Sequence, residues 1–299
     1  MNSYFSIIST IVFFLWGCQS LTPAPATSKE PKKLRPQVHG HRGSRGTHPE
    51  NTLSAFEESV ESGADWVELD LNLAKGDVPV VSHDPAVSVD FCIGPDQRPL
   101  KRSLPIRTLS VNQLKKFDCG SVPNPLFPDQ KSVPGQRLLT LEEVLIWAKS
   151  KSPKKVHLNI EAKMAGLKNS TEKSTFVRTV VTLLKKHNYT ENVVFQSFDI
   201  PTLREAKLLD PTLKLSALFE TGKLSLCEET KKLGAQIISP AFHLLSPDLI
   251  QECHRLGILI HPWTLNRLDE WKQAVAWGVD GIITDYPRRL IQFLNEETK

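Results

Sequence analysis

From residue 37 onward, short runs rich in β-branched residues alternate with amphipathic segments of helical periodicity. The strand-like runs are 37–41, 65–71, 78–83, 156–162, 192–198, 214–220, 235–240, 258–265 and 281–286. Helical patterns lie between most of them, for example at 50–63, 140–150, 175–187, 247–257 and 268–278. This alternation is typical of parallel strands joined by helices, so it predicts an α/β fold.

The connection lengths limit how these nine runs can be arranged. Between Leu73 and Val78, where the third run begins, there are only the four residues 74–77, whereas a parallel crossover needs about ten residues or more. The third run must therefore return antiparallel, as a short hairpin around Gly76, which brings His83 roughly opposite Leu69 and Asp70. The other eight runs can close a single (β/α)8 TIM barrel over residues 37–299.

Residues 85–139 interrupt the alternation with sequence rich in Pro and Gly. We expect a loop-rich insertion at the catalytic mouth of the barrel, where loops commonly determine specificity. Its apolar runs are too few to predict an independent domain. Cys92 and Cys119 both lie in this insertion, and the sequence leaves open whether they form a disulfide or remain buried thiols.

The first 36 residues are not expected to belong to the barrel. The apolar run 5–16 would form a helix of about 18 Å, too short for a bilayer core of about 30 Å, and it ends at Gly17-Cys18. We interpret residues 1–17 as a signal peptide with a lipobox, cleaved before a lipidated Cys18; an ordinary signal peptide or a retained anchor is the alternative. Residues 18–36 then form a Pro-rich linker. These features predict a protein of the cell envelope, on the outer membrane facing the periplasm, which contacts the membrane through its lipid anchor only.

The net charge of the whole chain is +4. Residues 19–36 contain four basic residues and one acidic residue, so they contribute +3 of this charge. The barrel region is therefore almost neutral. It also contains no basic helix and no interleaving of aromatic and basic residues, so nucleic acid is not an expected partner.

Three acidic residues lie at the ends of predicted strands. Period-two geometry places Glu68 and Asp70 on the same face of one strand, and Glu161 ends another. Carboxylates held close together repel one another unless a cation or a proton lies between them. Oxygen ligands suit Ca²⁺ or Mg²⁺, and the lack of a His or Cys cluster argues against zinc. The sequence therefore predicts one divalent cation, Ca²⁺ or Mg²⁺, bound by these three acids.

Two histidines also end predicted strands: His41, which is followed by Arg42, and His83. A histidine pair beside a divalent cation suits cleavage of a phosphodiester. One imidazole takes a proton from the nucleophile and the other protonates the leaving alkoxide. The metal, Arg42 and Lys163 would stabilise the charge that develops on the phosphoryl group.

Eight short motifs carry a family resemblance. They are H-R-G at 41–43, P-E-N-T at 49–52, E-L-D at 68–70, H-D at 83–84, E-A-K at 161–163, Q-S-F at 196–198, W-T-L-N at 263–266 and G-I-I-T-D-Y-P at 281–287. With this order and spacing, from about residue 37 to 293, the chain resembles the glycerophosphodiester phosphodiesterase family. The resemblance implies a phosphoric diester hydrolase that cuts glycerophosphodiesters into sn-glycerol 3-phosphate and an alcohol.

The resemblance also implies roles for individual residues. His41 and His83 would be the acid and the base, while Arg42 and Lys163 would bind the phosphate. The three acids at the strand ends would hold the metal. Two nucleophiles remain open: a water molecule, or the vicinal hydroxyl of the substrate, which would first give a cyclic phosphate.

Glu50, Asn51 and Trp263 are expected to support the site or to contact substrate. Trp263 would pack either against the glycerol or within the top of the barrel core. The nearest alternative function is a related lipid phosphodiesterase, which would act on a lysolipid as a lysophospholipase D or on a phosphatidylinositol-like lipid as a phospholipase C-like enzyme. An apolar groove within residues 85–139 would favour it. An inactive barrel that only binds a phosphate ligand is a further alternative.

Overall fold

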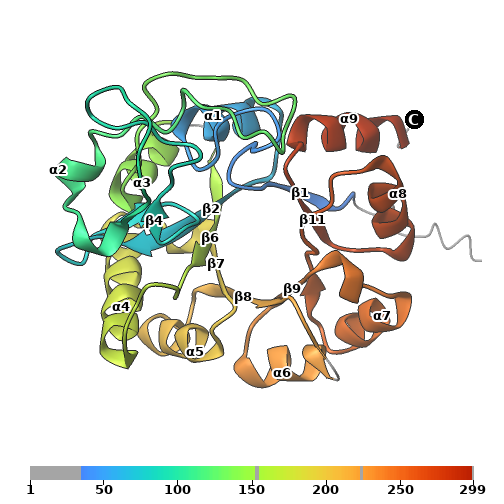
Figure 1. The fold of residues 1–299 in the computed structure, drawn as a ribbon. Helices are drawn as coiled ribbons and strands as arrows, with labels where there is room; N and C mark the ends of the chain where they lie inside the picture. The colour runs from blue at the N-terminus through green and yellow to red at the C-terminus, as the bar shows by residue number, and fades with distance from the viewer. Residues whose placement is uncertain (1–34, 152–154, 223–224, 298–299) are drawn as a thin grey trace, which may run out of the picture. The chain divides into compact units, whose positions relative to one another are not determined.

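Parallel strands form a curved sheet at the centre of the computed structural model, which describes residues 35–151, 155–222 and 225–297. Their spatial order is β10-β9-β8-β7-β6-β2-β1-β11 (Figure 1). In chain order, the described strands of this path are β1 (Gln37–Gly40), β2 (Trp66–Leu73), β6 (His157–Ala162), β7 (Val193–Ser197), β8 (Lys214–Phe219), β9 (Ile237–Pro240), β10 (Leu259–Ile260) and β11 (Gly281–Thr284). The signal peptide, Cys18 and most of the linker lie outside the described residues.

Backbone hydrogen bonds join the two ends of this path. Ile283 N donates to Pro262 O at 3.0 Å, and Leu265 N donates to Ile283 O at 3.0 Å. β10 is shorter than the predicted run 258–265, because Pro262 has no N–H group to continue a regular ladder. The prediction of a (β/α)8 barrel is confirmed.

Helices surround the strands (Figure 1). The described helices of this ring are α1 (Leu53–Glu61), α3 (Leu141–Ser150), α4 (Ser170–Lys186), α5 (Ile200–Leu209), α6 (Leu226–Leu233), α7 (Pro247–Arg255), α8 (Leu268–Trp277) and α9 (Pro287–Glu297). Several begin at a polar residue whose side chain accepts a hydrogen bond from the first turn, as Thr140 does before α3 and Ser246 before α7. None of the described helices combines the length and the apolar character needed to cross a membrane.

The alternation of residues in β2 separates the core from the barrel interior. Leu69 and Leu71 are fully buried in a cluster that includes Leu141 and Phe176 from α3 and α4. Burying a leucine side chain contributes about 1.5–3 kcal/mol. The intervening acids therefore point into the barrel, as the period-two pattern predicts.

The predicted hairpin is also confirmed. β3 (Pro79–Val81) pairs antiparallel with β2, with Leu71 opposite Val81. Ser82 N then donates to Asp70 O at 3.0 Å. The next residue, His83, is thereby brought to the carboxyl end of β2.

The insertion after β3 has a small apolar core of its own. It contains β4 (Ala86–Val87), β5 (Leu104–Pro105) and the short helix α2 (Val111–Leu114). Ile106 and Leu114 are buried together with Cys92, and a disulfide joins Cys92 to Cys119. A second disulfide, between Cys227 of α6 and Cys253 of α7, was not anticipated from the sequence.

Candidate active site

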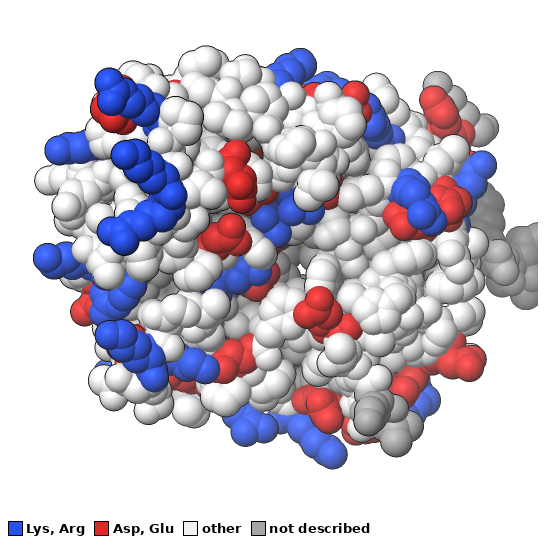
Figure 2. Space-filling model, in the orientation of Figure 1, with Lys and Arg blue, Asp and Glu red and all other residues white. Residues whose placement is uncertain are grey.

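A cavity of about 390 Å³ lies where the parallel strands end at their carboxyl termini. The residues that line it include His41, Arg42, Glu68, His83, Glu161 and Lys163. Figure 2 shows acidic and basic side chains gathered around a hollow in the face of the barrel. The residues predicted to act on substrate therefore come together, although they lie on separate strands.

The turn after β1 is built by the H-R-G sequence. Arg42 has φ of 48° and Gly43 has φ of 85°, a left-handed region that favours glycine. A Cβ atom on Gly43 would lie 2.6 Å from the Ala55 backbone, so a larger residue does not fit. Arg42 N donates to Glu68 Oε2 at 2.7 Å, and this bond fixes the turn against β2.

Glu68, Asp70 and Glu161 form the candidate metal centre. Each offers an oxygen within 4.8 Å of the others, and all three side chains are buried. Burial, followed by repulsion from Asp70 and Glu161, raises the pKa of Glu68 well above its usual range. Burial and Asp70 likewise raise the pKa of Glu161 to about 7.

The donor set fits a hard divalent cation. Buried oxygens of Asp70 and Glu161 lack a donor in hydrogen-bond geometry; their neighbour is the Lys163 ammonium, at 3.3 Å and 2.7 Å. A cation between the three carboxylates would relieve the repulsion that raises the pKa of Glu68. All-oxygen coordination of this kind suits Ca²⁺ or Mg²⁺.

Arg42 and Lys163 provide positive charge beside the acids. Arg42 contacts Glu50 at 2.7 Å and Asp70 at 3.5 Å. Burial disfavours the charged form of Lys163, but Asp70 and Glu161 outweigh burial and raise the pKa of Lys163 above its usual value. In the same way, burial opposes ionisation of Asp70, but Lys163 and Arg42 lower its pKa below the usual range. Both cations therefore stay charged at neutral pH and are available to a phosphate.

His41 forms a hydrogen-bonded pair with Asp285, with 2.6 Å between Nδ1 and Oδ1. Arg45 donates twice to the same carboxylate, at 2.9 Å and 3.0 Å, and Asn266 donates at 2.7 Å. Burial lowers the pKa of His41 to about 4, against the opposing effect of Asp285. A neutral imidazole that donates Nδ1–H to Asp285 keeps Nε2 free as a base, 4.0 Å from Glu68.

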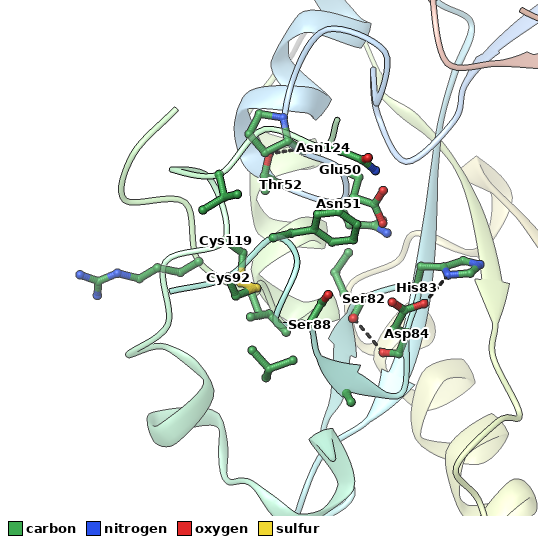
Figure 3. A pocket seen from close by; sticks show the side chains of 18 of the residues that line it. Glu50, Asn51, Thr52, Ser82, His83, Asp84, Ser88, Cys92, Cys119 and Asn124 are labelled. Atoms are coloured by element: carbon green, nitrogen blue, oxygen red, sulfur yellow. Dashed lines mark hydrogen bonds and ion pairs between the residues drawn. A yellow bond between two sulfur atoms is a disulfide. The ribbon is translucent and has the colours of Figure 1, made fainter. Parts of the chain in front are cut away.

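His83 has a different environment. Its side chain is 33% exposed, and its Nδ1 lies 2.8 Å from the Asp84 carboxylate (Figure 3). Asn72 of β2 donates to the backbone carbonyls of Ser82, His83 and Asp84. This clamp fixes the position of the backbone that carries His83.

The supporting residues also reach the site. Glu50 accepts a hydrogen bond from Arg42, and Asn51 donates to Asp70 Oδ2 at 2.9 Å. Trp263 lines the cavity and lies edge-on to Phe198, with 5.6 Å between ring centroids. Its indole N–H donates to the backbone of Ser239. Trp263 therefore forms part of the cavity wall.

Sequence reasoning did not assign roles to three residues that the site uses. Asp285, Arg45 and Asn266 hold His41 in place, although Asp285 and Asn266 lie within motifs noted in the sequence. Asp285 could have been predicted from its position, because it directly follows the strand β11. Arg45 lies in the turn after β1 and had no such signal.

The interior of the barrel below the site is also polar. Gln196 donates to Glu68 at 3.1 Å, and Asn159 donates to Gln196 at 3.1 Å. Asn159 also lies 3.3 Å from Nδ1 of the buried His39, whose ring packs 4.8 Å from that of His261. This chain of contacts supports Glu68 from beneath.

A barrel whose strand ends carry three clustered carboxylates, a buried arginine, a partly buried lysine and a histidine pair defines a hydrolase of phosphate esters. The sequence model of the glycerophosphoryl diester phosphodiesterase family matches residues 41–289. The chain belongs to this family. It is accordingly an enzyme of the phosphoric diester hydrolase class.

Known proteins share this sequence and fold over most of their length. The glycerophosphodiester phosphodiesterase of Caldanaerobacter subterraneus subsp. tengcongensis is 29% identical over 263 residues, which cover 88% of this chain and 99% of that relative. A Silicibacter pomeroyi DSS-3 protein assigned to the glycerophosphoryl diester phosphodiesterases is 26% identical, with a TM-score of 0.85 and coverage of 88% and 94%. An Oleispira antarctica phosphodiesterase, solved with the product sn-glycerol-3-phosphate, shares the fold at 24% identity, with a TM-score of 0.72 and coverage of 88% and 97%.

Proposed function

We propose that this enzyme hydrolyses glycerophosphodiesters to sn-glycerol 3-phosphate and an alcohol, with one divalent cation and a histidine pair. The observation that carries the proposal is the convergence of Glu68, Asp70 and Glu161 within 4.8 Å, in a cavity that His41 and His83 also line. The product bound to the Oleispira antarctica phosphodiesterase supports the same product here.

The three carboxylates would hold Ca²⁺ or Mg²⁺. When bound, such a cation neutralises charge on the phosphoryl oxygens and orients the diester. Arg42 and Lys163 lie beside the carboxylates and keep their charge, so they bind the remaining phosphate oxygens. These local charges matter because the barrel region is otherwise nearly neutral.

The two histidines differ in a way that divides the proton transfers between them. His41 is neutral and is oriented by Asp285, so its Nε2 takes the proton from the nucleophile. His83 is partly exposed and its Nδ1 lies beside the Asp84 carboxylate, so its Nε2 delivers a proton to the leaving alcohol. A cyclic phosphate detected by phosphorus NMR during turnover would identify the vicinal hydroxyl as the nucleophile, because attack by water forms no cyclic product.

The proposal is tested by the release of sn-glycerol 3-phosphate from glycerophosphocholine. EDTA is expected to abolish activity, and added Ca²⁺ or Mg²⁺ to restore it. His41→Ala is expected to lower kcat by at least about 100-fold, since general acid–base catalysis contributes this much. The exposed His243 offers a matched control, and His243→Ala should retain wild-type activity. An EDTA-resistant wild type or a fully active His41→Ala variant would contradict the assigned site.

We also propose that Cys18 is lipidated after removal of residues 1–17, and that the enzyme is held on the outer membrane facing the periplasm. The two disulfides support an oxidising compartment of this kind. Metabolic labelling with palmitate tests the anchor. Cys18→Ser should abolish labelling and release activity from the membrane fraction, and labelling that persists would refute the assignment.

A lysolipid substrate is the alternative to a glycerophosphodiester. The insertion does contribute apolar residues to a second cavity, but that cavity has a volume of only about 60 Å³. This space suits a compact group better than a long acyl chain, and it therefore favours the glycerophosphodiester.

A further inference from the structure

One part of the insertion, residues 124–131, packs against the turn that follows β1. Lys131 N donates to Thr47 O of that turn at 2.9 Å. The side chain of Gln130 joins the same contact and is almost fully buried. Pro125 and Pro128 lie within the segment, and their rings fix the backbone angle φ. The insertion is therefore held firmly to the turn at this point.

The side-chain amide of Gln130 joins the two segments. Its Nε2 donates to Arg45 O at 2.7 Å and to His48 O at 3.1 Å. Its Oε1 accepts a hydrogen bond from Asn124 N at 2.6 Å. One side chain thereby satisfies three backbone groups, and leaving such groups buried without a partner costs free energy. Gln130 therefore fixes the backbone of Arg45 relative to the insertion.

The other end of Arg45 lies against an aromatic ring of the same segment. Its guanidinium carbon is 4.7 Å from the centroid of the Phe127 ring, a distance that allows a cation–π interaction. The Arg45 side chain is only 18% exposed, so water screens this contact little. The Phe127 ring also lies edge-on to Tyr286, with 6.5 Å between centroids. The ring is thus itself held in place by a neighbour of the site.

Arg45 needs both supports because of the contact that it makes. Its Nε and Nη2 donate to the two oxygens of Asp285 at 2.9 Å and 3.0 Å, and this double contact requires the guanidinium plane to match the carboxylate. An unsupported arginine side chain would sample many rotamers. The Asp285 oxygen that Arg45 Nε contacts is also the one that pairs with His41 Nδ1. A displaced Arg45 would therefore disturb the orientation of His41.

We propose that Phe127 and Gln130 are positioning residues for the reaction. They hold Arg45 on Asp285, and through this carboxylate they keep His41 in the orientation needed to take a proton. The inference rests on the proposed function, in which His41 is the base. The insertion thereby contributes to proton transfer through Arg45.

Phe127→Leu and Gln130→Glu each remove one of the two supports. Leucine is apolar but lacks the ring, so kcat of the full chain on glycerophosphocholine should fall by about fivefold or more. Glutamate has no N–H group for the two carbonyls, so kcat should fall by about tenfold or more. KM should change by less than about twofold, since neither residue lines the cavity of about 390 Å³. Phe127→Tyr keeps the ring and should retain the wild-type kcat.

A double-mutant cycle with Arg45→Ala separates positioning from a general effect on stability. Arg45→Ala should itself lower kcat by about tenfold or more. In that background, Phe127→Leu should lower kcat by less than about twofold further, because the side chain that Phe127 supports is gone. Leu126 provides the matched control, since it precedes Phe127 and is 80% exposed. Leu126→Ala should keep the wild-type kcat, and thermal melts establish that each variant is folded.

The outcomes separate this inference from the proposed function. Wild-type turnover together with an unchanged kcat in Phe127→Leu and Gln130→Glu would overturn the positioning role and leave the diesterase function standing. Losses confined to KM, or a full additional loss for Phe127→Leu in the Arg45→Ala background, would also overturn it. If one of the two variants does not fold, the other provides the test, because each supports a different end of Arg45. Absence of turnover by the wild type, with Ca²⁺ or Mg²⁺ present, would overturn both proposals together.

Discussion

Asp285→Asn removes the charge that orients His41 and changes little else in shape. The wild-type carboxylate is fully buried and accepts hydrogen bonds from His41, Arg45 and Asn266. An amide offers one acceptor oxygen and one NH₂ group in place of two acceptor oxygens. If Arg45 and Asn266 keep the oxygen, the NH₂ group faces Nδ1 of His41, which must then accept the hydrogen bond and carry its proton on Nε2.

The expected loss follows from this change of tautomer. A histidine protonated on Nε2 cannot take a proton from the nucleophile, so the contribution of general base catalysis, about 10²- to 10⁴-fold, is lost from kcat. This range corresponds to about 3–5 kcal/mol of barrier. Asp285 opposes the effect of burial on the pKa of His41, so its loss lowers that pKa further below about 4. His41 therefore stays neutral at pH 7, and the acid limb of the pH–rate profile moves to lower pH. Activity at pH 7 falls nevertheless, because the neutral imidazole carries its proton on the wrong nitrogen.

The assay compares kcat, KM and the pH–rate profile of the wild type and Asp285→Asn on glycerophosphocholine. Asp269→Asn is the matched control, since Asp269 also accepts two hydrogen bonds from one arginine, Arg267, but is exposed. The control should leave kcat and the profile unchanged. A loss of less than about tenfold in kcat for folded Asp285→Asn, or a loss confined to KM, would refute the orienting role.

Four further predictions concern stability and the metal. Leu69→Ala should lower the free energy of unfolding by about 2–5 kcal/mol, because the side chain is fully buried outside the barrel interior, and urea unfolding measures this loss. Replacing Cys227 and Cys253 together by Ser should cost about 3.5 kcal/mol in the chain-entropy model, since the bond closes a loop with a sequence separation of 26, and a thermal melt checks it. Glu161→Gln should weaken Ca²⁺ or Mg²⁺ binding by at least about tenfold in a calorimetric titration, because it removes a ligand charge. Burial opposes ionisation of Asp118, but hydrogen bonds from neighbouring groups outweigh it and lower the pKa of Asp118. Its contribution to stability should therefore be lost as the pH falls below about 4. In Asp118→Asn, the midpoint of urea unfolding should depend less on pH between pH 2 and 6 than in the wild type.

Each of these predictions has an outcome that would contradict it. Leu208 is 83% exposed, so Leu208→Ala should not destabilise the protein, and equal losses for Leu208→Ala and Leu69→Ala would argue against the core assignment. A double serine variant with wild-type thermal stability would mean that the second disulfide contributes nothing. Unchanged metal affinity in Glu161→Gln would remove that residue from the metal centre. An acid-stability profile that Asp118→Asn does not alter would assign the acid sensitivity to other groups.

Local patterns in the sequence predicted the fold because each pattern depends on nearby residues. The alternation in β2 assigns Leu69 and Asp70 to opposite faces without any knowledge of the partner strands. The four-residue connection around Gly76 similarly requires a hairpin. The insertion was harder to predict, since its small core depends on contacts among short segments, such as Ile106 against Cys92, that have no strong periodicity.

For the candidate site, the sequence likewise predicted only what depends on local patterns. Strand-end positions identify His41 and Glu161 as members of the site, but they do not reveal which residues hold them. The partner of His41 is Asp285, 244 residues further along the chain. The Cys227–Cys253 disulfide was missed in the same way, because it depends on how α6 packs against α7 and not on a local spacing.

The alternation of β2 also limits how this enzyme can vary. Neighbouring residues such as Leu69 and Asp70 serve the fold and the chemistry separately, so a single substitution can alter one of them and leave the other intact. Gain or loss of one residue within the strand has the opposite effect, because it turns every following side chain to the other face. It would place carboxylates among the packed helices and leucines at the candidate metal centre. Descendants of this chain can therefore change activity through substitutions in β2, while its length must stay constant.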